Sequence, residues 1–212
     1  MAARGFPIRL AAMSALAFEL AATIRHDGHG GIADSLETDA GVREWVHHNT
    51  PLVENVIGRP FDPDALPAGD ALGVPLHEIR RAVRSLFARA VSPAPPSRAD
   101  ANTLLAPATA LRLLNTAADG LGTAHLTWPD DSDPITHWSR RASDPLPLLL
   151  GAIGRSGIDF LTGPDRPRLR ACPAARCVKY FLQDDPRQTW CSPKCGNRER
   201  VNRHYHRKQA AN

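Results

Sequence analysis

Four cysteines near the end of the chain have the spacing of a metal site. Cys172, Cys177, Cys191 and Cys195 are the only cysteines among the 212 residues, and they form a C-x4-C-x13-C-x3-C pattern. Two close pairs separated by a longer segment can bring four thiolates around one tetrahedral Zn²⁺, a cation that favours sulfur ligands and has no redox chemistry. We therefore predict that these residues bind one structural zinc ion.

Two other interpretations of the cysteines, as two disulfides or as buried free thiols, are less favoured. Disulfides are typical of oxidising compartments and of chains too small to build a core, whereas 42% of this chain is hydrophobic.

The start of the chain imitates a secretory signal, with Arg4 and Arg9 followed by the apolar residues 10–18, but Glu19 interrupts the apolar run. No run reaches the roughly 18 apolar residues of a membrane span. We expect a cytoplasmic protein without a membrane partner.

The segments around the cysteines predict a small treble-clef-like zinc module. Alternating side chains over 178–183, a polar turn at 184–187 and a return segment at 188–190 indicate a β-hairpin between the cysteine pairs. Ser192 and Pro193 are typical of a helix start, so a helix would carry Cys195 in its first turn. The positive end of that helix would then lie beside the anionic zinc–thiolate centre.

Charge is divided sharply along the chain. Residues 166–208 contain twelve Lys and Arg against three Asp and Glu, a formal charge of +9, and the remaining 14 basic and 19 acidic residues give −5. A basic helix next to the zinc site suits the phosphates and base edges of DNA. The residues that we expect to contact nucleic acid are Lys194, Asn197, Arg198, Arg200, Arg203, Arg207 and Lys208. The alternative is a solvated basic face or a frayed cationic tail.

The residues from Cys191 to Arg198 carry a resemblance to a known family. Their sequence, Cys-Ser-Pro-Lys-Cys-Gly-Asn-Arg, is followed by the basic helix, and the Leu169–Pro173 entry and the Tyr180-Phe181 pair are also similar. This pattern resembles the CGNR zinc-finger family of bacterial proteins, in which the finger follows an N-terminal domain called ABATE. The resemblance implies four zinc-binding cysteines and a DNA-binding role in stress-induced transcription regulation.

Residues 1–163 are predicted to form a mainly helical domain with a small β component, followed by the zinc finger at 164–212. Residues 8–25 favour an apolar helix, and Thr38 favours the start of a short helix through His48. The proline-rich residues 50–75 indicate a loop.

Pro75 is expected to open the strongest amphipathic helix of the chain. Apolar residues at helical spacing indicate one buried face, while Arg80, Arg81, Arg84 and Arg89 lie mostly opposite. Because these arginines belong to an otherwise acidic region, we interpret them as a solvated face, and the alternative is a surface that binds an acidic partner.

The segment from residue 97 to residue 163 gives mixed signals. Ser97 favours a short helix that Pro107 closes, and 110–114, 124–128 and 135–138 favour the strands of a small sheet. A helix is predicted from Pro145 to Leu161, weakened in its middle by Gly154 and Gly157, and residues 163–170 then form a short linker.

Enzyme motifs are missing from the sequence. It contains no G-x-S-x-G, phosphate-loop, dinucleotide or H-E-x-x-H motif, and the zinc interpretation uses every cysteine as a ligand. We therefore predict a transcription regulator that binds DNA through the finger and uses the N-terminal domain to sense a signal or to form a homodimer. The alternatives are a zinc-stabilised module that binds protein or RNA and, with less support, a small-molecule enzyme. The sequence does not identify a small-molecule effector.

Overall fold

The chain folds into a mainly helical body with a small zinc-finger-like end. The computed structural model describes residues 12–27, 31–127, 135–139 and 141–210, with the backbone alone described for 12–13, 127, 135–137 and 204–210. The helices are α1 (Ala12–Ala21), α2 (Asp39–Ile57), α3 (Asp70–Val91), α4 (Pro107–Ala118), α5 (Pro145–Thr162) and α6 (Pro193–Ala210). The strands are β1 (Ile24–His26), β2 (Ile32–Asp34), β3 (Thr123–Thr127), β4 (Ile135–Ser139), β5 (Leu169–Ala171) and β6 (Tyr180–Leu182). Short 3-10 helices are η1 (Pro63–Ala65), η2 (Arg98–Asp100), η3 (Asp119–Leu121) and η4 (Arg166–Arg168).

A cluster of four aromatic rings joins the helices to the finger end of the molecule. Phe18 of α1 and Phe160 of α5 each lie near Phe87 of α3, with ring centroids 6.0 and 5.0 Å from it. Tyr180 of β6 meets Phe87 edge-on at 5.7 Å. Such ring pairs add stability beyond the apolar area that they bury. Through Tyr180, β6 therefore packs as part of the main core.

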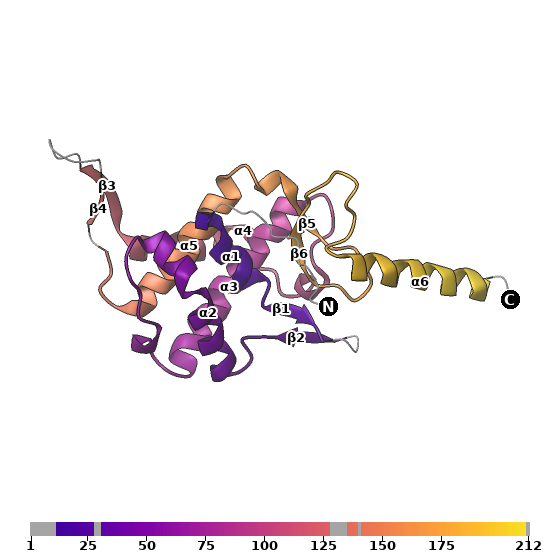
Figure 1. Cartoon of the computed structure of the whole chain (residues 1–212), viewed down its shortest axis with the longest axis horizontal. Helices are drawn as coiled ribbons and strands as arrows, with labels where there is room; N and C mark the ends of the chain where they lie inside the picture. Colours follow the sequence, from indigo (N-terminus) through magenta and orange to yellow (C-terminus); the bar gives the residue numbers. More distant parts are fainter. Residues whose placement is uncertain (1–11, 28–30, 128–134, 140, 211–212) are drawn as a thin grey trace, which may run out of the picture.

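Helix α5 begins after Asp144 as predicted and runs through the middle of the helical body (Figure 1). Gly154, which we expected to weaken this helix, lies directly against α4. A Cβ atom at Gly154 would come within 2.7 Å of the Ala118 nitrogen and 2.8 Å of the Leu114 carbonyl oxygen. The glycine therefore allows two helices to approach closely, a packing role that a propensity argument does not detect.

The proline-rich loop predicted at 50–75 is partly wrong. Thr38 caps α2 by accepting a hydrogen bond from the Gly41 amide, as expected, but α2 continues past Pro51 to Ile57. Burial of Val53 and Val56 offsets the backbone hydrogen bond that Pro51 cannot donate. Helix α3 starts at Asp70, with Pro75 inside it rather than at its start.

The strand predicted at 110–114 is also wrong. These residues belong to α4, where Ala110 and Leu114, one helical turn apart, are buried against the core. Pro107 opens this helix instead of closing the preceding one, because the first helical position needs no amide donor. The predicted strands at 124–128 and 135–138 are found as the antiparallel pair β3–β4, in which Thr123 faces Ser139, while Trp128 lies outside the described residues.

The first helix is shorter than predicted. Residues 8–11 lie outside the described residues, and α1 ends at Ala21, where the Thr23 hydroxyl donates to the Leu20 carbonyl. Ile24, predicted as helix, begins a β1–β2 hairpin that the sequence did not suggest. The helical spacing of Ile24 was misleading here because a strand also partly buries this apolar side chain.

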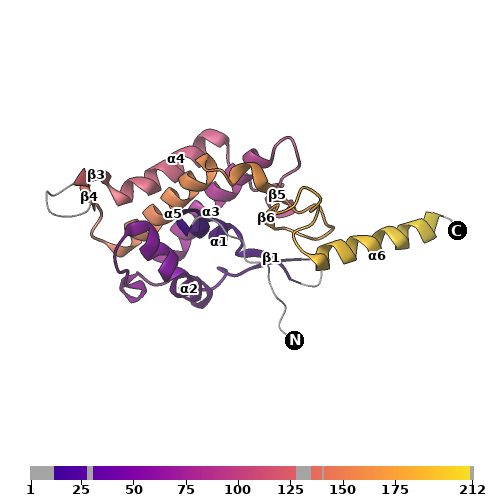
Figure 2. The same ribbon diagram turned by 45° about the horizontal axis from the view of Figure 1, so that its top comes forward.

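The C-terminal segment has a hairpin and a helix, as predicted, but the pairing of the hairpin differs. β6 pairs with β5, the strand directly before Cys172, and Leu169 lies opposite Leu182. The predicted return segment 188–190 is not a strand. Helix α6 starts at Pro193 and extends beyond the rest of the molecule in both views (Figures 1 and 2). None of the helices in the described part of the chain has the length and apolar character needed to cross a membrane.

Candidate metal centre and basic helix

The four cysteine sulfurs converge at one point. Their Sγ atoms all lie within 4.8 Å of one another. Cys191 Sγ is 3.7 Å from Cys177 Sγ and 3.5 Å from Cys195 Sγ. A tetrahedral zinc with Zn–S bonds of about 2.3 Å places its sulfurs about 3.8 Å apart, whereas a disulfide requires about 2.05 Å. The site fits one structural Zn²⁺ held by Cys172, Cys177, Cys191 and Cys195.

Backbone contacts set the positions of the four thiols. Cys172 donates its amide to the Lys179 carbonyl across the β5–β6 hairpin at 2.9 Å. Arg176 adopts a left-handed backbone conformation (φ 65°), which turns the chain back so that Cys177 faces Cys172. Cys195 lies in the first turn of α6, where its amide donates to the Ser192 hydroxyl. The positive end of α6 is therefore beside the sulfurs, as predicted.

Hydrogen bonding within the cluster separates the proton affinities of the thiols. Hydrogen bonding to Cys172 lowers the pKa of the Cys177 thiol, and hydrogen bonding to Cys172 and Cys177 raises the pKa of the Cys191 thiol. Zinc binds cysteines as thiolates and must displace the thiol protons, so acid favours metal release.

Arg198, predicted to contact nucleic acid, lies against the metal site. Its Nη2 atom donates to the Cys195 sulfur at 3.3 Å. The neighbouring Glu199 accepts a hydrogen bond from the Ala175 amide in the loop between the first two cysteines. The second turn of α6 therefore holds the metal loops together, and a role of Arg198 in nucleic-acid binding stays a prediction.

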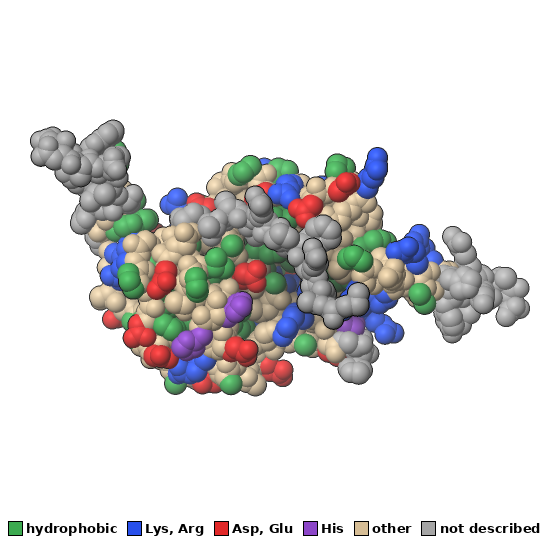
Figure 3. Space-filling view, viewed as in Figure 1, with side chains coloured by type: hydrophobic (Ala, Val, Ile, Leu, Met, Phe, Trp, Pro, Cys, Tyr) green, Lys and Arg blue, Asp and Glu red, His purple; other side chains and the backbone are tan. Residues whose placement is uncertain are grey.

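The other described basic residues of α6 face solvent. Lys194, Arg200 and Arg203 are exposed, as is Asn197. Arg200 Nη2 donates to Asn197 Oδ1 at 2.7 Å, so Asn197 orients that guanidinium. Arg207 and Lys208 belong to α6, but their side chains lie outside the described residues. On the face shown in Figure 3, Lys and Arg gather at the finger end and Asp and Glu lie mainly over the helical body.

Trp190 is a site residue that the sequence interpretation missed. A Cβ atom at Gly196 would come within 2.9 Å of Trp190 Cδ1, so only glycine leaves room for the indole at this position. The indole packs on the buried cluster of Cys172, Cys177 and Cys195. A glycine within the first turn of a helix that is otherwise free of glycine was the available signal.

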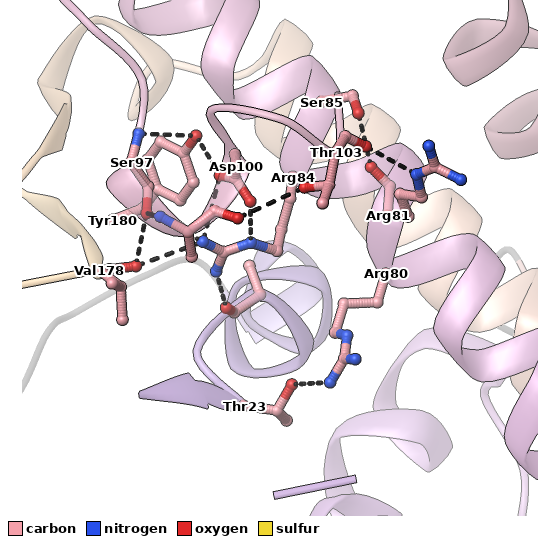
Figure 4. Close-up of polar contacts among 12 residues, drawn as sticks. Thr23, Arg80, Arg81, Arg84, Ser85, Ser97, Asp100, Thr103, Val178 and Tyr180 are labelled. Atoms are coloured by element: carbon pink, nitrogen blue, oxygen red, sulfur yellow. Dashed lines mark hydrogen bonds and ion pairs between the residues drawn. The ribbon is translucent and has the colours of Figure 1, made fainter. Parts of the chain in front are cut away.

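A buried arginine links the helical body to the finger. Arg84 of α3 is 4% exposed and contacts Asp100 through two nitrogens, at 2.7 and 3.1 Å. It also donates to the Ala21 carbonyl at the end of α1 and to the Val178 carbonyl next to β6 (Figure 4). The prediction that Arg84 belongs to a solvated face is wrong, because the long side chain reaches buried acceptors on four residues, Asp100, Ser97, Ala21 and Val178.

Finger residues complete the same network. Tyr180 donates its hydroxyl to Asp100 at 2.7 Å, and the Ser97 hydroxyl donates to the Val178 carbonyl at 2.8 Å. Burial raises the pKa of the Tyr180 phenol above its ordinary value, so the phenol remains a hydrogen-bond donor at neutral pH. Buried polar networks are stable only when each member is satisfied, so the finger and the body fix one another's position.

Arg80 is buried as well, contrary to the solvated-face prediction. It is 8% exposed, and its Nη2 atom donates to Asp34 Oδ2 of β2 at 2.6 Å. Arg81 and Arg89 are exposed as predicted. The helical period separates apolar from polar residues, but it does not reveal which arginines have buried partners.

The fold and the site define a helical domain that carries a four-cysteine zinc finger with a basic helix. Residues 14–164 match the ABATE family model, described as "Putative stress-induced transcription regulator", and residues 168–208 match the CGNR zinc finger. The first match spans most of the chain, so the chain belongs to the ABATE family and has a CGNR zinc finger at its end. None of the curated proteins matches it.

Proposed function

We propose that the protein regulates transcription by binding DNA through the zinc finger and α6. The observation that carries the proposal is a basic helix anchored at one end to the metal centre and extending beyond the body (Figures 1 and 2). Residues 164–212 act as the DNA-binding unit, and residues 1–163 sense a signal or form a homodimer. Free cysteines suit the reducing cytoplasm.

Phosphate contacts would supply most of the affinity. The +9 segment at 166–208 attracts a polyanion, while the −5 of the remaining chain keeps DNA at the finger end. Arg200 and Arg203 are exposed on α6. Asn197 already orients Arg200, which reduces the side-chain entropy that Arg200 would lose on binding a phosphate. Arginine forks suit both phosphate and guanine edges.

The first prediction concerns the arginines of α6. Replacing Arg200, Arg203 and Arg207 together with glutamine should weaken binding of the zinc-loaded protein to a duplex of about 30 base pairs. Because each lost phosphate contact removes about 0.9 from the slope of log K against log salt, the slope should fall by about 3. Fluorescence anisotropy at several NaCl concentrations measures both effects.

A matched control removes the same charge elsewhere. Arg89, Arg98 and Arg112 are exposed on the helical body, so their replacement with glutamine should leave the salt slope nearly unchanged. Equal losses in the two triple variants would contradict a binding surface on α6. Binding that does not depend on salt would contradict the phosphate contacts.

The alternative is a module that binds protein or RNA without sequence-specific DNA recognition. The same basic helix would then dock on RNA or on an acidic partner. Competition of labelled duplex by RNA of the same sequence distinguishes these functions. If the RNA displaces the duplex at equal or lower concentration, the finger is not selective for DNA.

A further inference from the structure

A cavity of about 480 Å³ opens on the body between the β1–β2 hairpin, α3 and the segment around η2. Its volume lies within the range of about 300–1,000 Å³ that is usual for small-molecule sites. Ile24, Ile32 and Leu104 form apolar walls. Ile32 is 54% exposed and Leu104 is 40% exposed, so part of this apolar surface has no cover within the described chain.

Among the described residues that line the cavity, Arg81 differs from Arg80 and Arg84 because it has no carboxylate partner. Arg80 and Arg84 line it, but Asp34 and Asp100 neutralise them through the contacts described above. Arg81 donates through Nε to the Thr103 carbonyl at 2.7 Å, which holds the side chain in place. Within the described residues Arg81 has no carboxylate partner, so its outer nitrogens remain for a ligand.

Ser85, which lines the cavity, and Asp34, which pairs with Arg80 of its wall, favour binding rather than catalysis. The Ser85 hydroxyl donates to the Arg81 carbonyl and accepts from the Leu105 amide, so it is not placed as a nucleophile. Burial alone would raise the pKa of Asp34, but hydrogen bonding to Arg80 holds it below its ordinary value. Asp34 is therefore a poor general base near neutral pH.

We propose that this cavity binds a small organic anion with an apolar body, and that Arg81 pairs with the anionic group. Arg84 and Asp100 form both the wall of the cavity and the contact with Val178 and Tyr180 of the finger. The proposed site thus lies beside the contacts of Arg84 that position the zinc finger, and Figure 4 shows these contacts. A sensing role for the ligand rests on the proposed function, whereas its binding does not.

A pair of fluorescent dyes tests the proposal on the full, zinc-loaded chain. 8-Anilino-1-naphthalenesulfonate carries an anionic group on an apolar body, and N-phenyl-1-naphthylamine has the same body without charge. The anionic dye should bind at one saturable site. Arg81→Gln should weaken it about five- to tenfold, because a charge-assisted contact at a partly exposed site is lost. The neutral dye should bind equally to the variant and the parent protein.

Two further variants determine where the dye binds. Arg89→Gln removes an exposed arginine of the same helix away from the cavity and should leave both affinities unchanged. Ala99→Trp fills the cavity from η2 and should abolish binding of both dyes, with thermal unfolding checked in each variant. Anionic-dye binding that survives Ala99→Trp, or that is unchanged in Arg81→Gln, would overturn the proposal. No DNA enters these measurements, so their outcome is independent of the proposed function.

Discussion

At the scale of single residues, the charged side chains of α3 show how context decides burial. Arg80 and Arg84 are buried because each has a carboxylate partner brought from another segment, Asp34 from β2 and Asp100 from η2. Such pairs contribute little net stability compared with apolar residues of the same size, but losing one partner leaves a buried charge uncompensated. The buried arginines therefore fix the position of the β1–β2 hairpin and of η2.

The pair of Asp34 and Arg80 should make stability depend on pH. The pKa of Asp34 is lower in the folded than in the unfolded chain, so its contribution is present above the unfolded pKa of about 3.9 and is lost as pH falls through the folded value. Asp34→Asn should lower the free energy of unfolding at pH 7 by about 1–3 kcal/mol. Urea unfolding followed by tryptophan fluorescence at pH 7 and pH 3 measures this difference.

The Asp34 variant should also lose less stability than the parent protein between these two pH values. Asp119 is exposed, so Asp119→Asn serves as the control and should retain the pH dependence of the parent protein. An Asp34→Asn variant with the parent's pH dependence would show that this pair does not govern acid stability.

At the scale of elements, α6 both contributes a cysteine to the metal site and forms the proposed DNA-binding surface. Its first turns carry Cys195, the Arg198 contact to that sulfur and the Glu199 contact to Ala175. Gly196 leaves space for Trp190 at the start of the helix. The metal centre therefore determines the direction of α6, since the residues that orient this helix also contact the cysteines and their loops.

A pair of glycine substitutions separates helix propensity from packing. Gly196→Ala should lower the free energy of unfolding of the finger by about 1–3 kcal/mol and speed zinc transfer to a chromogenic chelator, because the new methyl group displaces Trp190. A Cβ atom at Gly73 of α3 would meet nothing within 4 Å. Gly73→Ala should instead stabilise the protein by about 0.4–1 kcal/mol and leave zinc transfer unchanged. Gly196→Ala with unchanged zinc transfer would contradict the packing argument.

At the scale of the whole molecule, the finger shares the core of the helical body. Tyr180 contributes its ring to the aromatic cluster and its hydroxyl to Asp100, while Leu169 and Leu182 are buried in the same core. A short linker between independent units would not require these contacts. We therefore expect a perturbation of the network around Arg84 to affect the body and the finger together.

Tyr180→Phe tests the polar part of this contact because it keeps the ring in the aromatic cluster. Removal of the hydroxyl takes one of two donors from Asp100 Oδ2 and the acceptor from the Ser97 amide, so the free energy of unfolding should fall by about 1–2 kcal/mol. Zinc content, measured by elemental analysis, should stay at one ion per chain because the cysteines are untouched. Chemical unfolding with unchanged stability would show that the hydroxyl does not help to hold the finger.

The sequence alone determined the local features of this protein. The cysteine spacing predicted the metal centre because four ligands for one ion require two close pairs. Ser192 and Pro193 predicted the start of α6, and the apolar period predicted α3, because capping and periodicity act within one or two helical turns. The match of 14–164 and 168–208 to two families agrees with the resemblance found in the motif.

Only the tertiary structure decided what depends on distant partners. Pro51 remains within a helix because core burial outweighs one missing hydrogen bond, and residues 110–114 form a helix because α5 accepts their apolar side. β6 pairs with β5, and Arg84 is buried because Asp100, Ala21 and Val178 meet at one point. Contacts between segments far apart in the chain produce no periodic pattern in the sequence. The buried network around Arg84 and the cavity beside it can therefore be recognised only in the folded structure.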